Sequence, residues 1–275
     1  MDILSELGPA SYRQINADSW QGPVHQSKTD FVAEEVPVVL VYNNQPHVVM
    51  LCSPVDLEDF ALGFSITENI VRQPADVQSI RVYQRSKGIE VRITIPETCS
   101  ASISDKGKNL TGRTGCGLCG ATTLEQAIKP LKSVGPGLPL QASQLQAAFE
   151  TMRQRQSINQ LTGAVHAAAW LDAQQGVVKV REDVGRHNAL DKLIGSLIKS
   201  QYRFDQGWLL VTSRASYEMV QKAASVGVTL LAAISAPTAL AIQLAEKSGM
   251  TLVGFARNDN HVIYTHPHRL QHSFT

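Results

Sequence analysis

Apolar positions in the first half of the chain repeat with the periods of strands and of one helix. Residues 31–53 contain two apolar runs on either side of Asn43-Asn44, a pair typical of a tight turn, which predicts a β-hairpin. Residues 53–71 then carry apolar side chains at helical spacing behind the capping candidates Ser53 and Asp56. The pattern predicts a hairpin followed by a packed helix.

The remainder of the first half adds strands and a long polar segment. Residues 79–95 alternate apolar and polar on both sides of Gly88, which predicts a second hairpin and makes this half α+β. Residues 1–30 show no period, and we predict a flexible lead there. Residues 96–120 are polar and glycine-rich, and a loop of that length in a compact protein is usually functional or disordered.

The last third of the chain alternates strands and helices, which indicates an α/β region with buried parallel strands. The stretch VGPGLPL before it is the best boundary, so the predicted division is an N-terminal α+β domain over 31–135 and an α/β cofactor-binding domain over 136–275. A helix is also predicted over 141–154. The predicted strands are 208–213, 228–235, 251–257 and 261–266, and the predicted helices between them are 214–227 and 236–249.

Polar residues follow two of these strands, where an open α/β sheet binds ligands. Ser213 and Arg214 follow the first strand, and Ser235 follows the second, so both groups are expected at one edge, where hydroxyls, helix N–H groups and a guanidinium suit phosphate. Ordinary helix capping is the alternative. A further helix over 181–200, with Asp183 as its predicted cap, places His187 near the same site or in the core.

Composition limits the partners. The 275 residues carry 25 basic and 24 acidic side chains, a net charge of +1, which predicts neither nucleic-acid nor membrane binding. The opening MDILSELGPA lacks the features of a signal peptide, so we expect a cytoplasmic protein. The uncharged stretch 223–245 is interrupted by Gly, Pro and polar residues, and we interpret it as a strand and a helix rather than a membrane span.

Two cysteines lie close together in TGRTGCGLCG, at Cys116 and Cys119. The glycines match a dinucleotide fingerprint, but no strand precedes them and no acidic residue follows at the required distance. A zinc site would need further ligands, because Cys-x-x-Cys is half of a tetrahedral site. A thioredoxin-type pair would need a preceding strand, which is missing.

A carrier of sulfur fits the loop better. The glycines leave the thiols uncovered, Arg113 favours a thiolate, and a thiolate on a mobile arm can accept sulfur from one partner and deliver it to another. A redox-active pair, a zinc site or an exposed pair without a role stay as alternatives at this point.

Five long motifs, in the same order, resemble the FdhD family of formate dehydrogenase accessory sulfurtransferases. The resemblance runs from Phe31 to His268. The motifs are GRTGCGLCG, LTGAVHAAAW, REDVGRHNALDKLIG, TSRASYEMVQK and LVGFARNDNHVIYTH.

The resemblance implies a fold and an activity. The fold is a cytidine-deaminase-like three-layer C-terminal domain with a smaller α+β N-terminal domain. The activity is transfer of persulfide sulfur from an IscS-type cysteine desulfurase to the molybdenum cofactor before its insertion into formate dehydrogenase. Cys116 would bear the persulfide, Cys119 would support the transfer, and a homodimer without structural metal is expected.

The family also binds molybdenum bis-molybdopterin guanine dinucleotide (Mo-bis-MGD). The matching segment here is Phe255, Ala256, Arg257, Asn258, Asp259 and Asn260, which departs from the family's basic, Gly-containing turn and leaves Arg257 as its one cation. Ser213, Arg214 and His187 complete the expected cofactor site. The alternatives by function are a cofactor chaperone that transfers no sulfur and a thiol-disulfide oxidoreductase.

Overall fold

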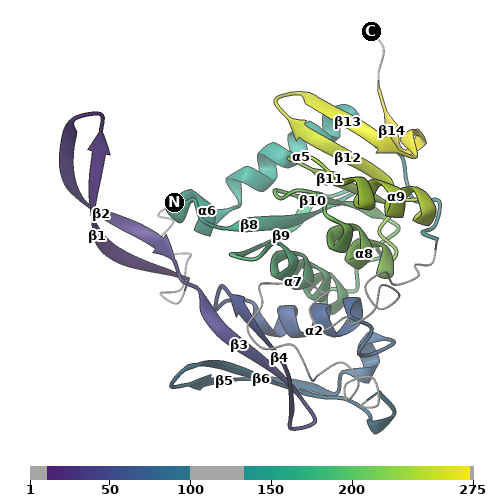
Figure 1. Cartoon of the computed structure of the whole chain (residues 1–275). Helices are drawn as coiled ribbons and strands as arrows, with labels where there is room; N and C mark the ends of the chain where they lie inside the picture. The colour runs from purple at the N-terminus through teal and green to yellow at the C-terminus, as the bar shows by residue number, and fades with distance from the viewer. Residues whose placement is uncertain (1–10, 100–132, 273–275) are drawn as a thin grey trace.

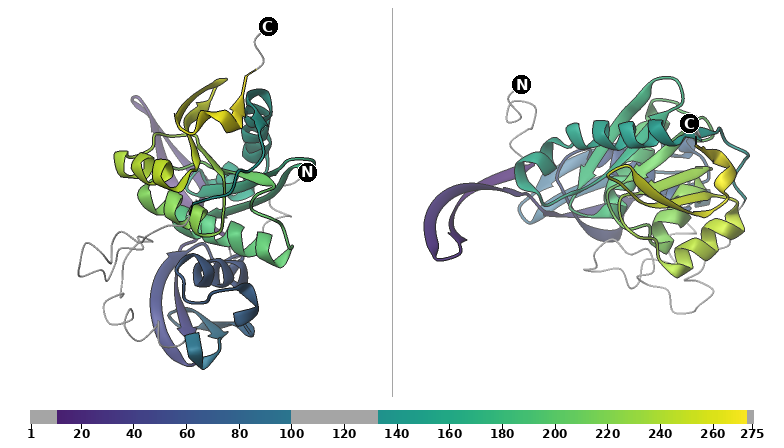
Figure 2. Two further views of the ribbon diagram at one scale, coloured as in Figure 1. Left: turned by 90° about the vertical axis from the view of Figure 1, so that its right-hand side faces the viewer. Right: turned by 90° about the horizontal axis from the view of Figure 1, so that it is seen from above.

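The computed structural model describes residues 11–99 and 133–272, which form a small sheet, a large sheet, and helices between and outside them (Figure 1). A two-stranded ribbon projects from this body, as the view from above shows (Figure 2). Within the described residues no helix is long and apolar enough to cross a membrane.

The small sheet has the strand order β4-β3-β6-β5, and α2 (Leu57–Thr67) covers one of its faces. Asn43 and Asn44 both adopt positive φ between β3 and β4, as a two-residue hairpin turn requires, which confirms the first predicted hairpin. The second hairpin and the helix are confirmed as well. The strands are β3 (Val36–Tyr42), β4 (Gln45–Cys52), β5 (Ser79–Arg85) and β6 (Gly88–Thr94), and a 3-10 turn η1 (Pro74–Asp76) precedes β5.

The large sheet has the order β13-β12-β11-β10-β8-β9. The pairs β10–β11 and β11–β12 are parallel, as the uninterrupted apolar runs predicted, and the other neighbours are antiparallel. The strands are β8 (His166–Asp172), β9 (Gly176–Asp183), β10 (Gly207–Val211), β11 (Leu230–Ala233), β12 (Thr251–Arg257) and β13 (Asn260–Thr265).

Helices cover both faces of the large sheet, which gives three layers. The helices α7 (Arg186–Lys199), α8 (Tyr217–Ser225) and α9 (Ala239–Ser248) pack on one face. On the other face lies α5 (Ala142–Gln154), and the short α6 (Ser157–Thr162) follows it. A mixed α/β fold is therefore confirmed, while the likeness to cytidine deaminases and the domain division at 135/136 stay predictions.

The two sheets are joined through α2 and α7, which cross at glycines. A Cβ atom on Gly63 would clash with the backbone of Asp191, and one on Gly195 would clash with the backbone of Asp59. Only hydrogen atoms fit between the two backbones, so the helices approach more closely than larger side chains would allow.

Buried ion pairs reinforce this junction. Lys222 of α8 contacts Asp191 at 2.9 Å and Glu68, just after α2, at 2.8 Å. Lys192 of α7 contacts Asp183 at 2.6 Å and donates to the backbone oxygen of Ser53 at 2.9 Å. These lysines and carboxylates pair with each other across the junction, which compensates for their removal from water.

Arg269 fixes the connection into the large sheet. Its guanidinium donates to the backbone oxygens of Gly135 and Pro136 in the connection. Near β12 it donates to the backbone oxygen of Gly249 and to the side-chain hydroxyl of Thr251. Arg269 is the last residue of a 3-10 turn, η3 (Pro267–Arg269). It directly precedes β14 (Leu270–Gln271), which pairs with β7 (Leu140–Gln141).

Two helix-cap predictions were wrong, and the expected lead contains strands that the sequence pattern did not indicate. Residues 12–33 form β1 (Tyr12–Gln21) and β2 (Val24–Ala33), an antiparallel ribbon with no buried residue on either face and so without an apolar period. The flexibility of the lead stays a prediction. Asp183 does not cap α7; its carboxylate accepts from Gly185, Asn188 and Ser53 at the end of β9. Asp56 sits at the start of α2 without a capping bond and faces Arg181 at 3.4 Å.

Candidate functional site

The carboxyl ends of β10, β11 and β12 share one edge of the large sheet, because the three strands are parallel neighbours. The segments that follow them touch: Thr238 donates its backbone N–H to the oxygen of Ala215 at 3.1 Å, and Phe255 donates to Ser235 at 3.3 Å. The prediction that the Ser213–Arg214 and Ser235 segments open on one edge is confirmed, and Phe255 lies beside them.

The first turns of α7 and α8 meet near this edge. His187 Nε2 lies 2.6 Å from Glu218 Oε2, and both side chains are buried. The contact is an ion pair by distance but lacks the angles of a good hydrogen bond. Because Glu218 engages Nε2, Nδ1 is the ring nitrogen left for a second partner.

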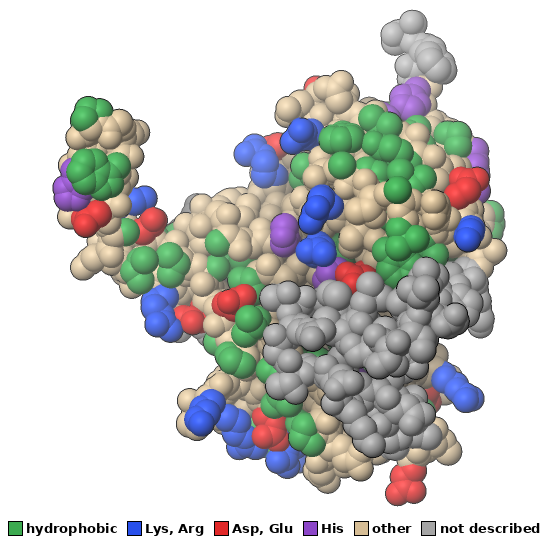
Figure 3. Space-filling model, in the orientation of Figure 1, with side chains coloured by type: hydrophobic (Ala, Val, Ile, Leu, Met, Phe, Trp, Pro, Cys, Tyr) green, Lys and Arg blue, Asp and Glu red, His purple; other side chains and the backbone are tan. Residues whose placement is uncertain are grey.

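Two more basic groups surround this pair. His166 begins β8 opposite Asp183, and it is half-buried. Burial lowers the pKa of His166, and the neighbouring Arg186 and His187 lower it further. Arg186 Nε is buried and meets no hydrogen-bond acceptor among the described residues. Figure 3 shows basic and histidine side chains side by side near the centre of this face.

The polar residues that follow β10 and β11 lie just before the first turns of α8 and α9. Ser213 is buried and donates its hydroxyl to the backbone oxygen of Arg214 at 3.0 Å, whereas the Arg214 residue is exposed. Thr238 caps α9 by accepting from Ala241 at 3.3 Å. Ser216 precedes α8, and its Oγ is buried without a partner among the described residues. Capping therefore accounts for Thr238 but not for Ser216.

Phe255 occupies a strained position. Its φ is 52°, a conformation that bulky residues rarely adopt, and the β12–β13 register shifts between Gly254 and Arg257. A Cβ on Gly254 would clash with Pro237, so β12 passes close to the segment that follows β11. Such strain is typical of functional positions.

The structure gives a reason why Asn258 and Asp259 can stand where a basic, Gly-containing turn was expected. Both residues have positive φ, at 51° and 57°, and they form the two-residue turn between β12 and β13. Asn and Asp tolerate this conformation well.

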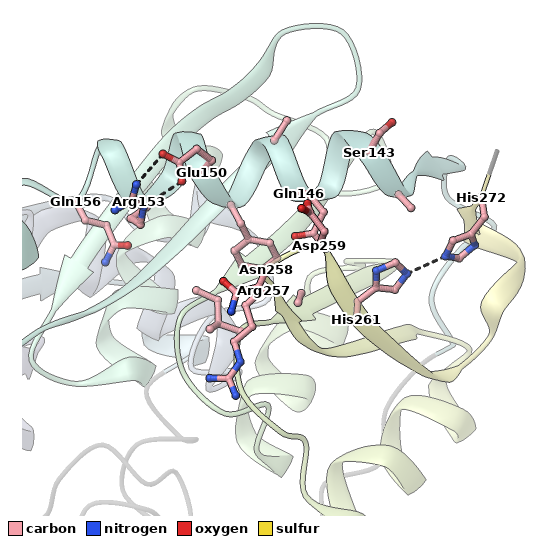
Figure 4. Close-up of a pocket in the computed structure, with 15 residues that line it drawn as sticks. Ser143, Gln146, Glu150, Arg153, Gln156, Arg257, Asn258, Asp259, His261 and His272 are labelled. Carbon is pink, nitrogen blue, oxygen red and sulfur yellow. Dashed lines mark hydrogen bonds and ion pairs between the residues drawn. The ribbon is translucent and has the colours of Figure 1, made fainter. Parts of the chain in front are cut away.

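A pocket of about 780 Å³ lies between α5 and the end of β12 (Figure 4). Of the predicted cofactor residues, Ala256 to Asp259 line it, whereas Phe255, Asn260, Ser213, Arg214 and His187 do not. Arg257 extends away from α5 in this view. The pocket carries the Glu150–Arg153 ion pair at 2.8 Å and the His261–His272 contact at 2.9 Å. The predicted residues therefore form two neighbouring groups at one edge.

The predicted thiol pair, Cys116 and Cys119, lies outside the described residues. Of the other cysteines, Cys52 is buried, and burial raises the pKa of its thiol well above the ordinary value, so it is a poor nucleophile. Cys99 is partly exposed. Within residues 11–99 and 133–272 no three potential metal ligands cluster.

Sequence reasoning missed part of the site. Glu218 lies in the first turn of the helix that follows Arg214, a position that could have drawn attention to it, but its contact with His187 spans 31 positions. Arg153 comes from α5, on the other face of the sheet, and nothing in its helical pattern indicates a pocket.

Comparison with known proteins places the chain in a family. Residues 33–271 match the model of the FdhD/NarQ family. A protein from Cupriavidus necator named sulfur carrier protein FdhD is 50% identical over 264 residues, covering 96% of this chain and 92% of that protein. One of the same name from Bordetella petrii is 49% identical over 245 residues, covering 89% and 88%.

A solved structure has the same fold. It is that of a protein from Desulfotalea psychrophila proposed to be a formate dehydrogenase accessory protein, with a TM-score of 0.77 at 20% identity, covering 96% of this chain and 100% of that one. The family resemblance expected from the five motifs is thus confirmed by matches along nearly the whole chain. The chain is a member of the FdhD/NarQ family.

Proposed function

We propose that this protein is a sulfur carrier that accepts persulfide sulfur on Cys116 and transfers it to the molybdenum cofactor used by formate dehydrogenase. The observation that carries the proposal is the 50% identity, along 96% of the chain, to a relative named sulfur carrier protein FdhD. The thiol pair in a glycine-rich segment supplies the chemistry.

Loading is a balanced exchange. The Cys116 thiolate attacks the terminal sulfur of a persulfide on an IscS-type cysteine desulfurase. The sulfur–sulfur bond of the donor breaks, a new one forms at Cys116, and the donor leaves as a thiolate. No outside oxidant or reductant is needed.

Unloading as sulfide requires two electrons, and Cys119 is placed in sequence to provide them. Its thiolate attacks Sγ of Cys116, hydrosulfide leaves, and a Cys116–Cys119 disulfide remains. A dithiol reductant then restores both thiols. This gives Cys119 its supporting part.

The cargo would bind at the edge of the large sheet. Mo-bis-MGD carries phosphates, and the edge offers Arg214, the helix start at Ser216, and His187 with Arg186 beside it. Arg186 Nε and Ser216 Oγ, both buried and without a partner among the described residues, fit an anionic group. The segment Phe255 to Asn260 and the adjacent pocket would hold another part of so large a molecule.

The same proposal includes the compartment, the partners and the oligomeric state of the protein. The protein works in the cytoplasm, where the desulfurase and the unfinished formate dehydrogenase are its protein partners, and it acts as a homodimer. Neither nucleic acid nor a membrane takes part, and the thiol pair holds no structural metal.

The test is to incubate the purified protein with a cysteine desulfurase and cysteine, and to map added sulfur by peptide mass spectrometry. We expect one extra sulfur on Cys116, absent from Cys116→Ala and present in Cys119→Ser. No added sulfur on the wild-type protein, with an active desulfurase, would overturn the carrier and favour a cofactor chaperone. Retained maturation of formate dehydrogenase by Cys116→Ala in cells would do the same.

A further inference from the structure

The small sheet has two contrasting faces. Ile89, Val91 and Ile93 of β6 are buried against α2. Because side chains alternate along a strand, Glu90 and Arg92 point to the opposite face, which no described element covers (Figure 1).

This outer face is rich in arginine. The register pairs Arg81 with Arg92 and Tyr83 with Glu90, so these residues and Arg85 lie on one side of the β5–β6 hairpin. Arg85 and Arg92 both bond Glu90 through Nε, and both stack on the Tyr83 ring, at 5.1 and 5.3 Å from its centroid. These bonds do not use the terminal amino groups of the two guanidinium groups, which can donate to a partner.

An apolar strip lies beside the arginines. On β3 and β4, register places Pro37 opposite Leu51 and Val39 opposite Val49, on the side away from the buried Val38 and Leu40. Leu51 is 39% exposed, and Pro37 is exposed as well. Apolar and basic residues on the lower left of the molecule are adjacent in the space-filling view (Figure 3).

The charge on this face is one-sided. The β5–β6 hairpin carries Arg81, Arg85, Arg92 and, in its turn, Lys87 against Glu90, which gives 4 − 1 = +3, whereas the whole chain carries +1. Positive charge is therefore concentrated here and balanced elsewhere. Such a patch attracts an acidic partner even though the chain as a whole attracts none.

We propose that the outer face of the small sheet is a docking surface for a protein that presents carboxylates beside an apolar strip. Arginine and tyrosine next to apolar side chains are typical of protein interfaces. Glu90 in the centre of the arginines disfavours a row of phosphates, so nucleic acid is the poorer fit.

The inference rests on the proposed function only for the choice of probes, which are the cysteine desulfurase and formate dehydrogenase lacking its cofactor. Binding of each to the immobilised chain is measured by biolayer interferometry between about 50 and 300 mM salt. The test variant combines Arg81→Gln, Arg85→Gln and Arg92→Gln. The matched control combines Arg72→Gln, Arg203→Gln and Lys247→Gln, all exposed and outside the four strands of the small sheet.

The test variant should bind at least one probe about tenfold more weakly at low salt and with a flatter salt dependence, while the control binds as wild type. Leu51→Ser should weaken the same complex at every salt concentration. Circular dichroism and thermal melting establish that each variant is folded.

Unchanged binding of both probes to the arginine variant, or no binding of either probe to the wild-type chain, would overturn the docking surface. Sulfur loading with excess desulfurase is measured in parallel. If loading succeeds while the variants bind normally, the docking inference fails and the carrier function stands. If wild-type loading fails while binding depends on the arginines, the carrier function fails and the docking surface stands.

Discussion

Charged side chains are used in opposite ways at the α2–α7 junction and on the outer face of the small sheet. At the junction, Lys222 and Asp191 are 3% and 1% exposed and pair with each other. On the outer face, Arg85 and Arg92 are 46% and 48% exposed and outnumber the one carboxylate they share.

The difference shows what each set of charges can do. Burial by itself would lower the pKa of Lys222, but the carboxylates of Asp191 and Glu68 outweigh it and raise that pKa. A buried charge so tightly compensated is bound to its partners and holds two parts of the chain in place. Exposed charges are screened by water, contribute little to stability, and stay available to other molecules.

Removing one buried charge should have the largest effect on stability. Lys222→Met leaves Asp191 and Glu68 without their cation, and we expect a loss of about 3–5 kcal/mol in the free energy of unfolding, measured in urea. The matched Lys199→Met removes a lysine that is 41% exposed and should cost at most about 1 kcal/mol. Equal losses from the two variants would show that burial does not decide what a lysine contributes to stability here.

Separating the helices tests the junction without changing charge. Gly195→Ala places a methyl group against the backbone of Asp59, which cannot move alone, and we expect about 1–3 kcal/mol of destabilisation. Gly135→Ala is the control, because no atom lies within 4 Å of the added methyl group and φ is not positive there. A normal urea midpoint for Gly195→Ala would show that the helices can part freely.

Neutralising the exposed arginines should lower the urea midpoint of unfolding only slightly at neutral pH, because solvent screens the pairs they form with Glu90. Hydrogen bonds from Arg85 and Arg92 lower the pKa of Glu90 to about 2 from 4.5. Any stability from this lowered pKa is present above pH 4.5 and lost as the pH falls towards 2. NMR titration of Arg85→Gln/Arg92→Gln should show the Glu90 pKa returning towards 4.5, and a pKa that stays near 2 would contradict the assignment.

The smallest effect is expected at half-buried His166. Its pKa is lowered in the folded state from 6.5, so protonation favours unfolding: stability is full above pH 6.5 and falls as the pH drops through the folded value. His166→Gln should lose this part of the pH dependence in thermal melts, whereas exposed His268→Gln should retain it. Identical pH profiles for wild type and His166→Gln would refute the interpretation.

The alternating elements could be predicted because their signals are local. The parallel strands β10 and β11 are buried on both faces, and so are the first four residues of β12, so their sequences are largely apolar runs between helices with polar starts. The sheet edge followed from this pattern, because parallel neighbours end together. Part of the candidate site was therefore predictable before any contact was known.

Long-range contacts decided the rest. Asp183 has the sequence setting of a helix cap, yet Lys192 and Ser53 engage its carboxylate, the latter 130 positions away. The ribbon of β1 and β2 gave no signal, because neither of its faces is buried and alternation is then invisible. Glu218 was missed because its partner, His187, is 31 positions away and is brought to it only where α7 and α8 meet.

The crossing of α2 and α7 has a consequence for fragments of the chain. A cut between residues 99 and 133 would leave Asp59 and Glu68 on one piece and Lys222 and Arg181 on the other. Each piece alone would expose the apolar side of a helix and unpaired charges that had been buried. The two pieces should therefore be poorly soluble when produced separately, and should reassemble into one folded particle when produced together.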